Sequence, residues 1–181
     1  MDAGLLTRAR RGDEAAFLAL YQRHRTAAFR FAYRLTASAP AAEDIVQECF
    51  LALLGGARFD GRQASLRTYL LGIVRHLAWK RARLADRESA EVDDRADGFD
   101  PLGRVLAAER AEMVERAVAA LPLGQREALI LFEYEELSLE EIAGITGADV
   151  GAVKARLFRA RESLRRRLAP LLAPCSEGSC G

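Results

Sequence analysis

The sequence is poor in the residues that build reactive centres, disulfide frameworks and membrane spans. Its 181 residues include three cysteines, two histidines and one tryptophan. No apolar run approaches the ~18 residues that a membrane-spanning helix needs, and the N-terminus lacks the pattern of a signal peptide. We therefore expect a cytoplasmic protein that is not inserted into a membrane.

The scarce residues also argue against an enzyme. Three cysteines do not make a disulfide framework, which agrees with a reducing compartment. The sequence has no glycine-rich phosphate loop and no grouping of a nucleophile with a histidine and an acid, since its histidines are only His24 and His76. We expect no catalytic residue and no cofactor.

Leu, Ala, Arg and Glu at helical spacing dominate the chain, and strand patterns are almost missing. We therefore predict an all-α fold. Helices are expected over residues 13–36, 40–54, 65–85, 103–120 and 125–134, and Pro170 and Pro174 are expected to end regular structure. In the third of these helices we place Leu66, Leu70 and Leu84 toward the core.

Charge is strongly segregated along the chain, although the net charge is only +1. Residues 1–85 hold 14 basic and 7 acidic residues (net +7), and residues 86–101 hold 2 basic and 7 acidic residues (net −5). The pattern predicts two small helical domains, residues 1–85 and 104–169, joined by an acidic flexible linker at 86–103 and followed by a flexible tail at 170–181. Two cationic blocks separated by an anionic one indicate two nucleic-acid surfaces.

Residues 138–168 form the clearest local pattern. Ser138 and Glu141 match a capping box at a helix start, Gly147 suits a left-handed helix end, and Asp149 suits the next helix start. Two helices joined by such a turn are the signature of a helix-turn-helix. The second helix buries Val153 and Leu157, and between residues 150 and 168 it carries seven basic residues against one acid (net +6). This pattern favours a reader of duplex DNA; the alternative is a solvated basic helix on an ordinary helical bundle.

The helix over residues 65–85 is also basic, and Trp79 lies among its cations. Cations hold phosphates and rings stack on exposed bases, so this face suits a DNA groove or a single strand. The alternative is that Trp79 packs against a neighbouring helix.

Four segments in this order resemble the extracytoplasmic-function (ECF) sigma factors of bacteria: GDEAAFLALYQRH, AEDIVQECFLALL, FDGRQASLRTYLLGIVRHLAWKRAR, and the stretch from LPLGQREALILF to RESLRRRL. The resemblance covers nearly everything except the linker and the tail. It implies an alternative sigma factor that binds core RNA polymerase through the β′ clamp and β flap and directs initiation at chosen promoters. The usual control of this family is an anti-sigma factor.

The resemblance also implies roles for particular residues. The polymerase β′ clamp would contact Asp44, Gln47 and Glu48. The −10 element would be opened and held by Arg58, Phe59, Asp60, Arg75, His76, Trp79, Lys80 and Arg83. The −35 element would be read by Lys154, Ala155, Phe158 and Arg159. The chain departs from the family where it has Tyr69 in place of Trp, His76 in place of Asn, and Ala155 in place of a polar residue.

Two readings of this sequence remain open. A stand-alone helix-turn-helix regulator would explain residues 138–168 equally well, but it leaves the AEDIVQECF helix without a role. In the tail, Cys175 and Cys180 could form a reversible disulfide or supply thiolates to a metal, or belong to an unstructured end.

Overall fold

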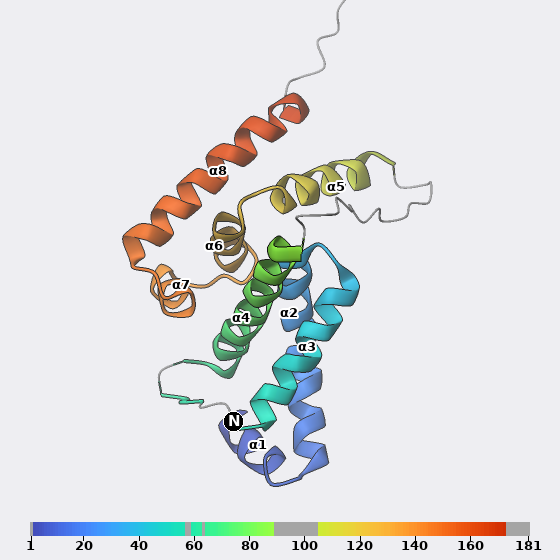
Figure 1. The fold of residues 1–181 in the computed structure, drawn as a ribbon, viewed down its shortest axis with the longest axis vertical. Coiled ribbons are helices and arrows are strands. Elements are labelled where there is room, and N and C mark those ends of the chain that lie inside the picture. The colour runs from blue at the N-terminus through green and yellow to red at the C-terminus, as the bar shows by residue number, and fades with distance from the viewer. Residues whose placement is uncertain (1, 57–58, 63, 89–104, 173–181) are drawn as a thin grey trace, which may run out of the picture.

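A computed structural model describes residues 2–56, 59–62, 64–88 and 105–172 (Figure 1). Over these residues the chain forms eight α-helices and no strand, which confirms the predicted all-α fold. The helices are α1 (Asp2–Ala9), α2 (Glu14–Thr36), α3 (Ala39–Leu54), α4 (Leu66–Glu88), α5 (Val105–Ala119), α6 (Leu123–Glu133), α7 (Leu139–Thr146) and α8 (Val150–Leu172).

Helices α2, α3 and α4 surround the N-terminal part of the core. Asp13 begins α2 by accepting the N–H of Ala16 at 2.9 Å, and Ser38 begins α3 by accepting the N–H of Ala41 at 3.4 Å. Such side chains satisfy backbone donors that a helix start leaves free. The core between these helices includes the fully buried side chains Leu20, Phe31, Ile45, Leu53, Leu70, Leu71 and Val74.

The placement of Leu84 in the core was wrong, because this side chain is 47% exposed. The buried apolar residues of α4 are Leu66, Leu70, Leu71, Val74 and Ala78, and none of residues 79–85 is buried. Leu84 lies five turns after Leu66 on the same side of the helix, so it is exposed because the covered length of α4 ends before it.

Helix α1 was not predicted from the sequence. Its start is tied to α2, since Asp2 forms an ion pair with Arg23 and lies 3.0 Å from Nε2 of His24. These partners are 21 and 22 residues away, so the sequence near α1 carries no sign of them.

Helices α5 to α8 form the C-terminal half. Ser138 and Glu141 make the predicted capping box at the start of α7, and Gly147 ends that helix in the left-handed region at φ 67°. Asp149 accepts the N–H of Ala152 at 2.9 Å at the start of α8. The helix-turn-helix is therefore present as predicted.

Pro170 does not end α8, contrary to prediction, because the helix continues to Leu172. A proline in the last turn forfeits only the bond to the carbonyl of residue 166, and carbonyls near a helix end reach water.

The two halves lie against each other along α4, which stands at the centre of the molecule (Figure 1). Helix α4 contacts α7, and α2 contacts both α5 and α6. Residues 89–104, which include most of the expected acidic linker, lie outside the described residues, as do Cys175 and Cys180 of the tail.

Candidate nucleic-acid interface

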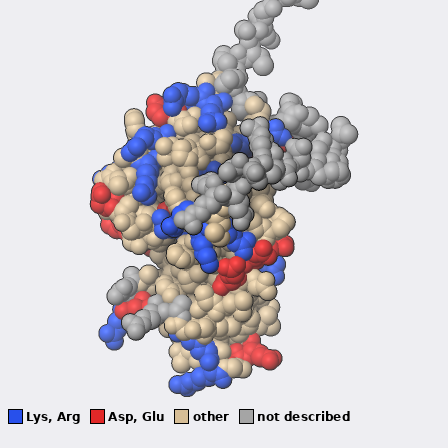
Figure 2. Space-filling view, in the orientation of Figure 1, with Lys and Arg blue, Asp and Glu red and all other residues tan. Residues whose placement is uncertain are grey.

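Helix α8 turns an apolar side to α6 and α7 and a basic side to solvent. Its inner residues Val153, Leu157 and Ala160 are buried, as their spacing predicted. Figure 2 shows Lys and Arg side chains gathered over α8 in the upper part of the molecule. This helix therefore offers a long cationic face on a packed support.

The four residues proposed for −35 contacts lie near the start of α8. Lys154, Phe158 and Arg159 are exposed, and Ala155 is partly buried. Phe158 is 68% exposed, the highest fraction among the exposed large hydrophobic side chains of the described residues. The exposed side chains can reach a ligand without any change in the helix.

An open groove of about 400 Å³ runs beside Phe158 between α6, α7 and α8. Phe132, Leu139 and Leu157 supply its apolar lining. Arg161 stands at its edge, where it pairs with Glu133 at 2.7 Å and lies 5.2 Å from the ring centre of Phe132. The groove thus joins an apolar floor to a cationic rim.

Helix α4 holds its predicted −10 residues on two different sides. His76, Lys80 and Arg83 are exposed to solvent. Arg75 and Trp79 are only partly exposed, because both lie against α6. Packing against a neighbouring helix, the alternative use of Trp79, is what the structure shows.

The segment before α4 carries the other predicted −10 residues. Phe59 packs its ring on Tyr69 with the ring centres 5.3 Å apart. Asp60 is exposed and accepts the N–H of Arg62 at 2.9 Å. Arg58 lies outside the described residues.

Sequence reasoning missed the residue that receives Arg75 and Trp79. Glu127 of α6 is 0% exposed, and its Oε1 lies 2.8 Å from Nε of Arg75. The indole N–H of Trp79 donates to the other oxygen, Oε2, of the same carboxylate. A lone acid beside the apolar stretch ALIL was a signal that Glu127 is buried, but nothing local indicates its partners.

A second buried acid, Glu135, joins the same two halves. Arg67 of α4 contacts Oε2 of Glu135 at 2.5 Å and its backbone carbonyl at 3.1 Å. Burial raises the pKa of Glu135, and the guanidinium groups of Arg67, Arg34 and Arg30 oppose this rise. The acid is thus held in a partly dehydrated, cationic setting.

The predicted polymerase contacts lie on α3, next to the basic helix α4. Asp44, Gln47 and Glu48 are all exposed. Arg81 of α4 contacts Asp44 at 3.4 Å and Glu48 at 2.8 Å. One guanidinium therefore holds the two carboxylates on the same side of the helix.

Family models match both halves of the chain. Sigma-70 region 2 matches residues 20–88, and Sigma-70, region 4 matches residues 111–164. The RNA polymerase sigma-H factor of Pseudomonas aeruginosa is 33% identical to this chain, and the alignment covers 94% of this chain and 95% of that relative. The ECF RNA polymerase sigma factor SigW of Bacillus subtilis is 32% identical, with 90% of this chain and 94% of the relative covered.

The chain belongs to the ECF family of RNA polymerase sigma factors. Proteins of this family are DNA-binding regulators. The solved structure of the sigma factor RpoE from Bartonella quintana, in complex with the anti-sigma factor NepR, has the same fold, with a TM-score of 0.70. It is 28% identical and covers 84% of this chain and 96% of its own.

The matched regions of this sigma factor contain its two basic helices. Region 2 includes α3, α4 and most of α2, and region 4 includes α6, α7 and the first two thirds of α8. Every described residue proposed to contact polymerase, the −10 element or the −35 bases lies inside one of these regions.

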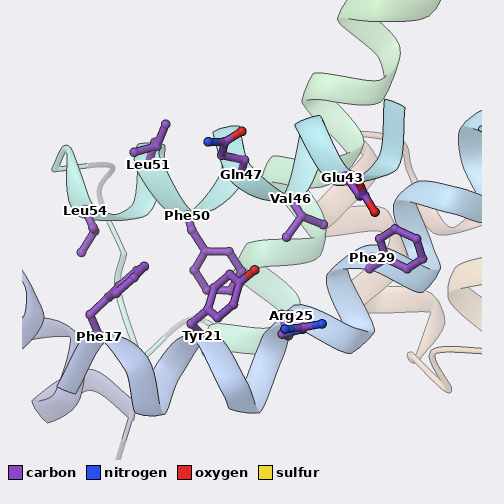
Figure 3. A pocket seen from close by; sticks show the side chains of 10 residues that line it. All are labelled: Phe17, Tyr21, Arg25, Phe29, Glu43, Val46, Gln47, Phe50, Leu51 and Leu54. Atoms are coloured by element: carbon purple, nitrogen blue, oxygen red, sulfur yellow. The ribbon is translucent and has the colours of Figure 1, made fainter. Parts of the chain in front are cut away.

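A second groove lies on the N-terminal half of the sigma factor, between α2 and α3. Its volume is about 540 Å³, and Phe17, Tyr21, Phe29 and Phe50 supply aromatic surface (Figure 3). The rings of Tyr21 and Phe50 pack edge to face with their centres 4.9 Å apart. Leu51, Gln47 and Glu43 stand along the α3 side, so the groove adjoins the polar face of that helix (Figure 3).

The described residues hold neither a metal-binding cluster nor a membrane-crossing helix. No group of three or more His, Cys, Asp or Glu side chains among them is placed to bind a metal ion. None of the helices in these ranges is both long and apolar enough to span a bilayer.

Proposed function

We propose that this ECF sigma factor divides promoter recognition between its two helical halves. As a sigma factor it binds core RNA polymerase and directs promoter-specific initiation. The N-terminal half, proposed as residues 1–85, docks on polymerase and opens the −10 element. The C-terminal half, proposed as residues 104–169, reads the −35 duplex. The observation that carries this division is the pair of separate cationic helices, α4 and α8, inside regions 2 and 4.

Helix α8 has the chemistry for a major-groove contact. Lys154 and Arg159 can donate to guanine O6 and N7 or to phosphates, and Phe158 can contact a thymine methyl group. Ala155 adds only a small apolar contact beside them. We assign sequence choice to this set and general affinity to the remaining cations of α8.

Helix α4 and residues 58–64 are proposed to hold the opened −10 strand. A base that leaves the stack costs a few kcal/mol, which the protein must offset with new contacts. His76, Lys80 and Arg83 are exposed, so they are free to approach phosphates. Arg75 and Trp79 could add a phosphate contact and a stacking surface, once Glu127 releases them.

The polar face of α3 is proposed as the docking site for the β′ clamp, and the C-terminal half as the partner of the β flap. Two carboxylates and an amide on a rigid helix suit a basic partner and fix its orientation. The sigma factor acts by binding alone, and we assign it no catalytic residue or cofactor. An anti-sigma factor, present in the Bartonella complex, is the proposed regulator and would cover these docking surfaces.

Reconstitution with purified core RNA polymerase tests the proposal. We expect the full chain to bind core polymerase and to start transcription at a defined promoter. Replacing Asp44 and Glu48 together by Ala should weaken core binding by about tenfold, because both carboxylates are exposed on the proposed docking face.

The matched control is Glu115→Ala, which removes an exposed acid from α5. It should leave polymerase affinity unchanged. If the chain binds promoter DNA but never binds core polymerase, it is a stand-alone helix-turn-helix regulator and the proposal is wrong.

A further inference from the structure

One buried acid of the C-terminal half holds two residues of the −10 surface. Arg75 and Trp79 lie one turn apart on α4, and both donate to Glu127 of α6. The Glu127 side chain is 0% exposed, whereas that of Arg75 is 22% exposed. Closure of the two halves therefore removes these two donors from solvent.

The carboxylate of Glu127 offers what a DNA phosphate offers. Each presents two oxygens that share negative charge, and an arginine binds either group through the same N–H donors. The Arg75 guanidinium also lies 5.6 Å from the ring centre of Trp79, so it sits near the ring that a base would stack on. Glu127 thus holds both the cation and the aromatic of this site.

We infer that Glu127 is an intrachain competitor of promoter DNA. In the free chain it occupies Arg75 and Trp79, and the −10 strand gains them only when α6 moves away from α4. This inference rests on the proposed function of α4 as the −10 surface.

Several other links across the contact are polar, and they lie beside buried apolar residues that join the two halves in one cluster. Arg67 binds Glu135, Arg126 donates to the carbonyl of Leu35 at 2.6 Å, and Arg34 lies 4.1 Å from the ring centre of Tyr134. Contacts of this kind between domains separate more readily than an apolar core does. The attraction within a buried ion pair is also nearly offset by the free energy lost when its two charges leave water. Opening of this pair therefore costs little free energy once DNA replaces Glu127 as the partner of Arg75.

Closure lowers the affinity of the free chain for DNA. The apparent affinity of a site falls in proportion to the fraction of molecules in which the site is open. A partner that holds the halves apart raises this fraction, and a partner that binds across both halves lowers it.

The first measurement is binding of the free chain to a fluorescein-labelled single strand that carries the −10 element of a promoter transcribed by the holoenzyme. Glu127→Gln removes the charge and replaces one acceptor oxygen with an amide NH2, which then faces a donor of Arg75 or of Trp79 and disfavours closure. We expect binding to tighten by about tenfold, as it must if only about one molecule in ten is open in the wild type.

Glu133→Gln is the matched control for this variant. It makes the same substitution on the same helix, but Glu133 pairs with Arg161 inside the C-terminal half. Binding of the −10 strand should not change. Equal tightening by both variants would mean that loss of negative charge alone improves DNA binding, and would overturn the inference.

The second measurement is the distance between the halves. Spin labels at Gln22→Cys on α2 and Glu140→Cys on α7, in a Cys175→Ser, Cys180→Ser background, should report a narrow distance for about nine in ten molecules of the otherwise unchanged protein. Glu127→Gln should add a longer, broader population. Glu127→Asp keeps the charge with a shorter reach and should shift both measurements in the same direction by less, so the inference stays testable if the Gln variant folds poorly.

Core-dependent transcription separates the two hypotheses. If the wild type and Glu127→Gln both transcribe, but their free-chain binding and distances are identical, the inference fails and the proposed function stands. If neither transcribes, the proposed function fails with it. Opening of the variant without tighter −10 binding would also refute competition by Glu127.

Discussion

Cys49 of α3 is a buried thiol in the centre of the N-terminal core. It is 0% exposed, and its Sγ lies 3.7 Å from the carbonyl oxygen of Leu70. Burial raises the pKa of this thiol from 9.0 to about 12, because the apolar surroundings cannot solvate a thiolate. Cys49 therefore behaves as a small apolar residue and stays neutral at physiological pH.

The pKa shift of Cys49 predicts a loss of stability at alkaline pH. In the unfolded chain the thiol ionises near pH 9, whereas in the folded chain it keeps its proton up to about pH 12. Its contribution is fully present below pH 9 and declines as pH rises toward 12, by up to about 4 kcal/mol. Urea unfolding of the Cys175→Ser, Cys180→Ser protein at pH 8 to 11 should show this decline.

Cys49→Ala in the same background is the comparison for that experiment. It should have a shallower slope of unfolding free energy against pH, because no thiol is left to ionise at this site. Parallel slopes for the two proteins would show that Cys49 is not the source of the decline.

At the scale of the element, α8 combines two tasks along one helix. Its first three turns carry the exposed Lys154, Phe158 and Arg159, and its later turns carry Arg165, Arg166 and Arg167. The turn after α7 presents these early residues, because Gly147 ends α7 in the left-handed region and redirects the chain into α8. We place sequence choice in the early turns and non-specific attraction in the later ones.

Arg159→Ala tests this division of α8. If Arg159 reads a base, promoter binding by the holoenzyme should weaken by about 1–3 kcal/mol. The protein should also lose discrimination at one −35 position. If its contact is a phosphate, the salt dependence should instead become shallower by about one unit of slope. Affinity measured against salt, on matched and altered −35 sequences, distinguishes the two.

Arg167→Ala is the control from the far end of the same helix. It removes an equal charge from an exposed side chain. Its effect should be the same for every −35 sequence. Unchanged affinity and salt slope for Arg159→Ala would contradict our placement of that residue.

At the scale of the whole molecule, Arg126 ties helix ends from both halves. Its guanidinium donates to the carbonyls of Leu35 at the end of α2, Ala119 at the end of α5, and Leu121. A cation is favourable there because helix C-termini carry partial negative charge and unpaired carbonyls. Burial lowers the pKa of Arg126, yet the side chain stays charged because an arginine starts from so high a value.

Arg126→Ala should therefore lower the free energy of unfolding by about 2–3 kcal/mol, since several hydrogen bonds from a charged donor are lost together. Arg116→Ala is the surface control: Arg116 pairs with Glu112 within α5, and its side chain is 76% exposed. That variant should cost about 0.5 kcal/mol or less. Equal losses in urea unfolding would mean that Arg126 contributes no more than a surface pair.

Local interactions account for what could be predicted from the sequence. The capping box links Ser138 to Glu141, and Gly147 closes α7 by itself through its left-handed φ. The buried side of α8 follows from apolar spacing in the same way, through Val153 and Leu157. The all-α fold, the helix-turn-helix and the two basic helices could therefore all be predicted from the sequence.

The failures at Leu84 and α1 have one physical cause. Apolar spacing shows that a helix has a buried side, but the length over which a neighbour covers that side depends on packing. Leu84 has the right residue type but lies beyond the covered length of α4, whereas the start of α1 is held by contacts of Asp2 with Arg23 and His24, which are distant in sequence.

The sequence by itself determined the helices, their caps, the buried stripes and the segregation of charge, because each depends on residues within a few positions of one another. Only the tertiary structure decided how α4 is used in the closed chain. Glu127 lies 52 residues from Arg75 and 48 from Trp79, and Arg126 lies 91 residues from Leu35. The spacing of charged residues along the sequence does not indicate which distant residue each one will contact. These contacts therefore follow only from the packing of one half against the other.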